Sequence, residues 1–246
     1  TWHGSPCWPP DGQFVLFDAT KARFGAAHIF RIAADGRDMT LKDLGPGRVP
    51  SLSPDGEQIA FYFSERDPDD FKRGVWVASA DGTQRRWLSE GVRPKWSPNG
   101  KSLAFTSSHE GEPSIYVLRG EKRERVLRES YDRIIGPCWS PDGKRLAFVG
   151  QRDGASELAI VGAGGEKDSF RVLVRGRVGW VPSWSPDGKS ILFWKKLDDG
   201  SYRFHTIHPD ADADPVMIKG QAGQFNSDPC CSPDGKQIAF TSKREE

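Results

Sequence analysis

Residues 137–148 read PCWSPDGKRLAF, and this stretch decides the fold because close copies of it recur along the whole chain. The Asp or Asn residues of the motif turns, at positions 11, 55, 99, 142, 187 and 234, follow one another at steps of 44, 44, 43, 45 and 47 residues. A near-constant period of this length indicates one structural unit used repeatedly. The other five copies are PCWPPDGQFVLF from Pro6, PSLSPDGEQIAF from Pro50, PKWSPNGKSLAF from Pro94, PSWSPDGKSILF from Pro182 and PCCSPDGKQIAF from Pro229.

Each letter of this motif has a mechanical role in a β-hairpin. Proline presets φ for the first central position of a type I turn, Asp or Asn follows, and Gly takes the left-handed position that closes a bulged hairpin. One strand therefore ends at the Trp and the next begins at the apolar tetrad. Unbroken apolarity indicates a strand covered on both faces. These second strands are expected at residues 14–17, 59–63, 103–105, 146–149, 191–194 and 238–240.

Four strands per period of about 40 to 45 residues are typical of a β-propeller. Third strands are expected at residues 28–32, 75–77, 114–118, 157–161 and 202–207, and fourth strands end at Leu41, Leu88, Leu127, Leu173 and Ile218. We therefore predict an all-β, six-bladed propeller of antiparallel four-stranded blades. Because the third and fourth strands have only five copies, we expect the sixth blade to be incomplete in this chain. It is either a two-stranded partial blade or, as we favour, a blade that further residues complete. The single domain covers residues 1–246, with blades starting near Gly4, Val49, Arg93, Gly136, Val181 and Asp228.

The repeat, with third strands such as SIYV at residues 114–117, resembles the WD-repeat-like blades of TolB-type propellers. The resemblance extends over essentially the whole chain. It implies a non-catalytic scaffold that binds protein and works outside the cytoplasm, in the periplasm, as part of an envelope complex. TolB carries an additional N-terminal domain, which this sequence lacks. Similar blades also occur in the propeller domains of prolyl-oligopeptidase-like peptidases and in oligogalacturonate lyases.

Composition and motifs exclude several classes of function. A net charge of +1, from 35 basic and 34 acidic residues, argues against a partner that is nucleic acid or an anionic membrane surface. No apolar run is long enough for membrane insertion. No G-x-S-x-G elbow is found, and the five histidines are scattered over hairpins and loops of different blades, so we expect neither an enzyme nor a cofactor. Cys7, Cys138 and Cys230 share one repeat position, which indicates a small slot near the channel and not a reactive thiol.

The candidate binding residues lie in loops that join a fourth strand to the next blade, at one mouth of the central channel. A ring of arginines there would bind the carboxylates of an acidic protein or peptide. The alternative is ordinary solvated loop charge, since acidic residues lie nearby. Exposed aromatics beside arginine form binding hot spots, although loop packing would also account for them. The residues are Arg48, Arg93, Arg133, Arg177, Trp180, Phe225 and Asn226.

Asp210, Asp212 and Asp214 place carboxylates at alternate positions, as a calcium loop does. The segment lacks the sharp-turn Gly and the distal Glu of an EF-hand, so an enlarged, solvated hairpin tip is the favoured interpretation and no metal is expected.

Three functions are therefore considered. The first is a binding scaffold whose partner docks at the channel mouth. The second is the propeller domain of a larger hydrolase or lyase, gating its active site. The third is a propeller that binds small ligands or carbohydrate, which requires an aromatic at the same loop offset in several blades. The sequence predicts no particular oligomeric state.

Overall fold

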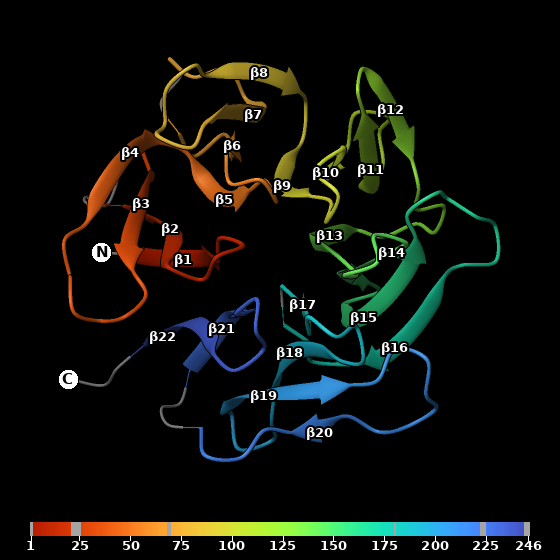
Figure 1. Cartoon of the computed structure of the whole chain (residues 1–246). Coiled ribbons are helices and arrows are strands. Elements are labelled where there is room, and N and C mark those ends of the chain that lie inside the picture. Colours follow the sequence, from red (N-terminus) through yellow and green to blue (C-terminus); the bar gives the residue numbers. More distant parts are fainter. Residues whose placement is uncertain (1, 21–25, 68–69, 180, 222–224, 244–246) are drawn as a thin grey trace.

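Antiparallel sheets stand around a common centre, with the first strand of each sheet innermost (Figure 1). The computed structural model describes residues 2–20, 26–67, 70–179, 181–221 and 225–243, and of residues 2, 3, 225, 226, 242 and 243 it describes only the backbone. All strand pairs in these residues are antiparallel. They contain no helix of the length and apolarity that a membrane span requires.

Each blade follows the order first, second, third, fourth strand from the centre outward. Blade 1 contains β1 (Trp2–Cys7), β2 (Phe14–Thr20), β3 (His28–Ala33) and β4 (Lys42–Pro46). Blade 2 contains β5 (Arg48–Leu52), β6 (Gln58–Phe63), β7 (Gly74–Ser79) and β8 (Arg86–Ser89). Blade 3 contains β9 (Val92–Trp96), β10 (Ser102–Ser107), β11 (Ser114–Arg119) and β12 (Lys122–Arg125). Blade 4 contains β13 (Arg133–Trp139), β14 (Arg145–Arg152), β15 (Ala155–Gly162) and β16 (Arg171–Arg175). Blade 5 contains β17 (Ser183–Trp184), β18 (Ile191–Lys196), β19 (Tyr202–Ile207) and β20 (Val216–Met217).

The predicted six-bladed architecture is wrong, because the described residues form five four-stranded blades. The sixth motif copy forms a two-stranded sheet of β21 (Phe225–Cys231) and β22 (Ile238–Lys243), which lies against β1 and β18. The physical reason is that the motif encodes an inner hairpin, whereas a blade also needs an outer hairpin. Phe240 on β22 shows the consequence. It is 47% exposed, whereas its counterparts Phe61, Phe105 and Phe148 are fully buried.

The motif turns have the geometry that their sequence predicts. In the turn at residues 53–56, the Gly56 N–H donates to the Ser53 carbonyl at 2.9 Å, and the Asp55 carboxylate accepts from the Glu57 N–H at 3.0 Å. Gly56 has a φ of 76°, in the left-handed region that a side chain disfavours. These bonds fix the register of β6 against β5, and so place the tetrad in the core.

Motif tryptophans join neighbouring inner strands. The Trp8 indole N–H donates to the Cys230 carbonyl at 3.1 Å, and the Trp139 N–H donates to the Lys95 carbonyl at 2.9 Å. The Trp184 indole N–H donates to the Cys138 carbonyl at 3.1 Å. Because each bond crosses from one sheet to the preceding one, the motif also sets the spacing of the sheets around the centre.

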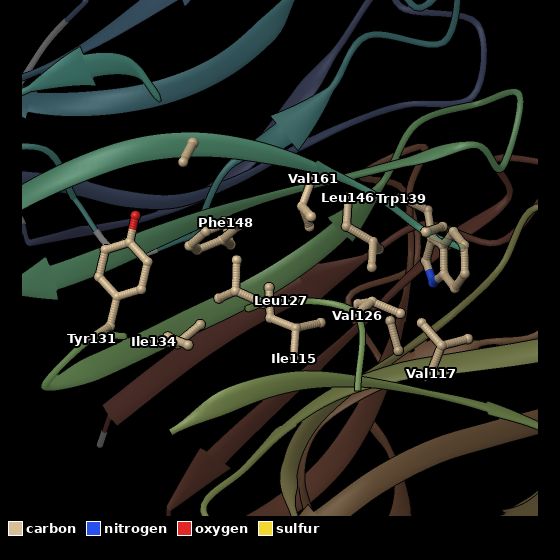
Figure 2. Packing of buried hydrophobic residues seen from close by; sticks show 13 residues of the cluster. Ile115, Val117, Val126, Leu127, Tyr131, Ile134, Trp139, Leu146, Phe148 and Val161 are labelled. Carbon is tan, nitrogen blue, oxygen red and sulfur yellow. The ribbon is translucent and has the colours of Figure 1, made fainter. Parts of the chain in front are cut away.

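The core lies between sheets that face one another. Figure 2 shows the cluster between blades 3 and 4, where Ile115 and Leu127 meet Leu146 and Phe148. All four side chains are completely buried. Burial of an aromatic or aliphatic side chain of this kind contributes about 1.5–3 kcal/mol, so the inter-blade clusters are the main source of stability.

Candidate functional site

An open cavity of about 1180 Å³ lies at the end of the channel that is remote from the motif turns. Its walls come from the starts of the first strands, for example at Arg48, Arg93 and Arg133, and from loops that follow second strands, for example at His109. We call this feature the channel-mouth cavity. Ligand pockets usually measure about 300–1,000 Å³, so this cavity has room for several residues of a peptide.

A repeated backbone distortion lines the channel-mouth cavity. The residue directly before the motif proline has a left-handed φ in every copy except that of Pro182, and the ladder register shifts beside it in β1, β5, β13 and β21. This conformation is unfavourable for a residue before proline, so it persists only where the surrounding sheet imposes it. Such bulges redirect side chains, and four of these residues line the cavity. The residues are Ser5 (47°), Val49 (50°), Arg93 (57°), Gly136 (62°) and Asp228 (51°).

Two carboxylates inside the channel-mouth cavity have raised pKa values. Burial raises the pKa of Asp18 on β2 from 3.8 to about 7, although the Val49 N–H and Arg48 oppose the rise. Burial also raises the pKa of Asp228 on β21. The Asp18 Oδ1 atom is sealed from solvent and accepts no hydrogen bond from the described residues. An unpaired buried acceptor costs about 1–3 kcal/mol, which makes this atom a marker of a site.

The arginines of the cavity differ in how they are paired. The Nε of Arg48 donates to both carboxylate oxygens of the buried Asp67, at 2.8 and 2.9 Å, so its charge is neutralised inside the wall. Arg93 acts electrostatically on both Asp18 and Asp228, yet it makes no hydrogen bond or ion pair with another described residue. The cavity therefore presents an unpaired donor beside an unpaired acceptor.

The comparisons with known proteins give the same architecture. A family profile described as "TolB beta propeller domain" matches residues 61–246, which is well over half of the chain. This chain belongs to the TolB β-propeller family. The solved structure of a putative TolB from Agrobacterium tumefaciens superimposes with a TM-score of 0.74 at 22% identity, covering 98% of this chain and 91% of that one. At that identity the likeness shows the fold alone.

Relatives of two kinds share TolB-type blades with this chain. The Tol-Pal system protein TolB of Francisella tularensis is 27% identical over 114 residues, which are 46% of this chain and 26% of that protein. Dipeptidyl-peptidase 5 of Porphyromonas gingivalis is 30% identical over 144 residues, which are 51% of this chain and 21% of that protein. This chain thus matches about a quarter or less of the length of these relatives, and both kinds bear on the choice of function.

Three of the four predicted arginines of this TolB-type propeller, Arg48, Arg93 and Arg133, line the channel-mouth cavity. Arg177 does not line it. Its Nη1 instead lies 3.0 Å from Oδ1 of the exposed Asp198. The offsets of the four arginines from the motif proline differ. Their role in binding a partner remains a prediction.

The predicted aromatic anchors cannot all be placed. Trp180 lies outside the described residues. Phe225 and Asn226 lie in β21, where they pair with Lys243 and Ser242, and their side chains also lie outside the description.

The aspartates of the calcium candidate lie in an exposed loop between β19 and β20. Asp210 pairs with Arg145 of blade 4 through a 2.5 Å contact, while Asp212 and Asp214 are exposed. Nowhere in the described part of the chain do three His, Cys, Asp or Glu side chains gather in a way that could hold a metal ion. The loop has the form of an enlarged hairpin tip.

The cysteines of the repeat position are free thiols. Burial raises the pKa of Cys138, and it raises the pKa of Cys230 to about 12. A thiol with a raised pKa is protonated at neutral pH and is a poor nucleophile, in agreement with the structural role predicted for this slot.

Asp18 and the pairing of Arg48 with Asp67 were missed by sequence reasoning. A signal for Asp18 was nevertheless present. The residue 12 places after the motif proline is Tyr62, Thr106, Val149, Trp194 or Thr241 in the other copies, so Asp18 is the single charged residue at that position. A comparison of repeat with repeat would have identified it.

Proposed function

We propose that this TolB-type propeller is a non-catalytic binding module and that a protein or peptide partner docks at the channel-mouth cavity. The observation that carries the proposal is an open cavity of about 1180 Å³ that is lined by the half-buried Arg93, which has no bonded partner among the described residues, and by Asp18, whose Oδ1 atom is buried and unpaired. A buried acceptor that the fold leaves unpaired is stabilised when a donor pairs with it.

The mixture of charges favours a peptide over a uniformly acidic or basic ligand. Arg66 and Arg133 lie in the same wall as Glu90 and Asp132. A peptide offers main-chain donors and acceptors together with side chains of either charge, so it can satisfy groups of both signs. We propose further that the partner belongs to an extracytoplasmic envelope complex, and the likeness to Tol-Pal system proteins supports this extension.

Among the described side chains, His109 is the one histidine that lines the cavity, and its contacts support a binding role. The His109 Nδ1 atom lies 2.6 Å from a carboxylate oxygen of Glu90, and both side chains are exposed. Nucleophilic catalysis by such a pair requires a hydroxyl or thiol in contact with the imidazole. Within the described residues, no serine, threonine or cysteine side chain is bonded to the His109 ring.

Site-specific photo-crosslinking tests this proposal. A benzoylphenylalanine at Arg66, in the cavity wall, is expected to crosslink the partner in the native host, whereas the same residue at Lys236, on a motif turn at the opposite end, is not. Arg93→Asn should weaken the crosslink at least tenfold, because asparagine tolerates the left-handed backbone while removing the guanidinium. Crosslinking from Lys236 alone would refute docking at the cavity.

A second function is favoured by the likeness to dipeptidyl-peptidase 5. In that case the propeller belongs to a larger hydrolase, and the cavity gates substrate entry. Sequencing the gene on both sides of the region that encodes this chain distinguishes the binding module from the hydrolase domain. A G-x-S-x-G segment in the same reading frame supports the hydrolase, and a frame without one supports the binding module.

A further inference from the structure

The interior of the channel-mouth cavity contains two carboxylates on neighbouring inner hairpins. Asp18 pairs with Gly4 across β1 and β2, and Asp228 lies in β21 beside Ser227, whose hydroxyl is 3.2 Å from the Asp228 Oδ2 atom. The two carboxylates interact electrostatically, and we call them the carboxylate pair. Asp18 Oδ1 is the atom of this pair that is sealed from solvent without a hydrogen-bond donor among the described residues.

Cationic side chains lie around the carboxylate pair, but none of them donates to the Asp18 Oδ1 atom. Arg48, which is also bonded to Asp67, and Arg93 act electrostatically on Asp18. Arg93 and Lys95 act in the same way on Asp228. With the carboxylates ionised, the group that completes the interior is therefore a cation that brings hydrogen-bond donors of its own.

The chemistry of the unpaired atom narrows the choice of cation. A carboxylate oxygen needs an N–H or O–H donor, and a primary ammonium supplies three such donors on a compact group. A divalent metal ion would need more ligands, and no group of three suitable side chains is found in the described part of the chain. A guanidinium would bring a second planar cation beside Arg93.

We propose that the carboxylate pair binds a primary ammonium group of the docked partner, supplied by a lysine side chain or by a chain N-terminus. This inference rests on the proposed function, and it gives the chemistry of the part of the partner that enters deepest. The arginines of the rim would then meet acidic or carbonyl groups of the same partner, while the interior recognises its cationic group.

Ionisation of Asp18 makes this recognition depend on pH. The groups that face Asp18 are Arg48 on β5, Arg93 on β9, Asp228 on β21 and the Tyr62 hydroxyl on β6. Burial raises the pKa of Asp18 to about 7, so the carboxyl is neutral at pH 5.5 and ionised at pH 8. If binding requires the ionised form, each pH unit below 7 weakens affinity by up to about tenfold.

The binding of small amides tests directly whether the carboxylate pair recognises a primary ammonium group. The probes are glycylglycinamide, with an N-terminal ammonium, acetyl-lysinamide, with a side-chain ammonium, and acetyl-norleucinamide, with neither. Binding is followed through the carboxyl ¹³C resonance of Asp18 in the whole chain. At least one ammonium probe should shift this resonance saturably, and the norleucine probe should not.

The pH profile separates the two sources of ammonium. An α-amino group loses its proton near pH 8 and lysine near pH 10.4, so the affinity for glycylglycinamide should peak near pH 7.5 and that for acetyl-lysinamide should stay high at pH 9. Tetramethylammonium carries the charge without N–H donors. Equal binding of tetramethylammonium and the ammonium probes would overturn the proposal.

Matched variants complete the test. Asp18→Asn keeps the shape of the side chain and removes its charge, and it should weaken the ammonium probe at least tenfold. Asp198→Asn removes a fully exposed carboxylate and should leave the affinity for the ammonium probe unchanged.

Cooperative thermal unfolding checks the fold of each variant, and Asp228→Asn provides a second interior variant. Unchanged probe affinity in both Asp18→Asn and Asp228→Asn, with crosslinking at Arg66 intact, refutes the ammonium site while docking stands. Loss of crosslinking at the cavity with retained probe binding refutes docking alone.

Discussion

Replacement of Asp18 by asparagine should stabilise the protein at neutral pH, by an amount that grows with pH. The pKa of Asp18 is raised from 3.8 to about 7 by burial, so the folded protein holds a proton that the unfolded chain releases. Each unit of pKa difference corresponds to about 1.4 kcal/mol, which gives at most about 4 kcal/mol of destabilisation once the carboxyl is ionised. Because Asp18 borders an open cavity and not a dry core, we expect roughly half of that amount, about 2 kcal/mol.

The sign follows from proton binding. Below pH 4 the carboxyl is protonated in both states, so the variant and the parent should be about equally stable. Between pH 4 and 7 the unfolded chain ionises first, and the stability of the parent falls relative to the variant. Asp187 contributes in the opposite direction, since the Ser185 hydroxyl lowers its pKa, but it is present in both proteins and cancels in the difference.

Urea unfolding at pH 4.5, 6.0 and 8.0, followed by tryptophan fluorescence, measures this difference. Asp198→Asn, which also removes one carboxylate, is the control for net charge. A difference in the free energy of unfolding that stays flat with pH, or a variant that is less stable at pH 8, would show that Asp18 is not held in an environment hostile to its charge. A saturating ammonium probe should recover part of the lost stability of the parent at pH 8.

Two further predictions concern the scaffold. Trp139→Phe should lower the free energy of unfolding by about 1 kcal/mol more than Trp96→Phe. The Trp139 indole N–H donates to the Lys95 carbonyl, whereas the Trp96 indole N–H is buried without a partner among the described residues. Urea unfolding measures both variants, and equal losses would contradict the role given to the indole hydrogen bonds. Gly82→Ala should lower the free energy of unfolding by more than 2 kcal/mol, because the added methyl would overlap a backbone carbonyl of the preceding blade. The methyl of Gly56→Ala meets open space, so this variant should lose only about 1 kcal/mol from its left-handed φ. Thermal unfolding ranks the two variants, and the reverse order would be inconsistent with the packing of the turn at Gly82.

Scaffold and site occupy different positions of the same repeat. The motif turn and the apolar tetrad are nearly identical in all copies, since each must make the same hairpin and the same inter-blade contacts. The positions directly before the motif proline and 12 places after it vary widely, and these positions line the channel-mouth cavity at Arg93, Asp228 and Asp18. One face of the propeller can therefore change its ligand without disturbing the core.

The sequence by itself determined the all-β class, the period and the inner hairpins. A Ser-Pro-Asp-Gly turn and a continuous apolar tetrad act within a dozen residues, so local stereochemistry is sufficient to predict them. The number of blades was overestimated because a motif count registers inner hairpins only, and the pairing of outer strands depends on weakly patterned segments such as Val216–Met217.

Only the tertiary structure decided the site. Asp18 and Asp228 lie in strands of two different sheets, and Asp67 lies in a loop of a third blade. The sequence around a carboxylate does not show whether it will contact water, an arginine or another carboxylate. The closure of the sheets around one channel brings Asp18 beside Asp228, Arg93 and Arg48, and Arg48 is in turn bonded to Asp67. Burial and charge pairing are properties of that arrangement in space, which is why they could not be obtained from the repeat alone.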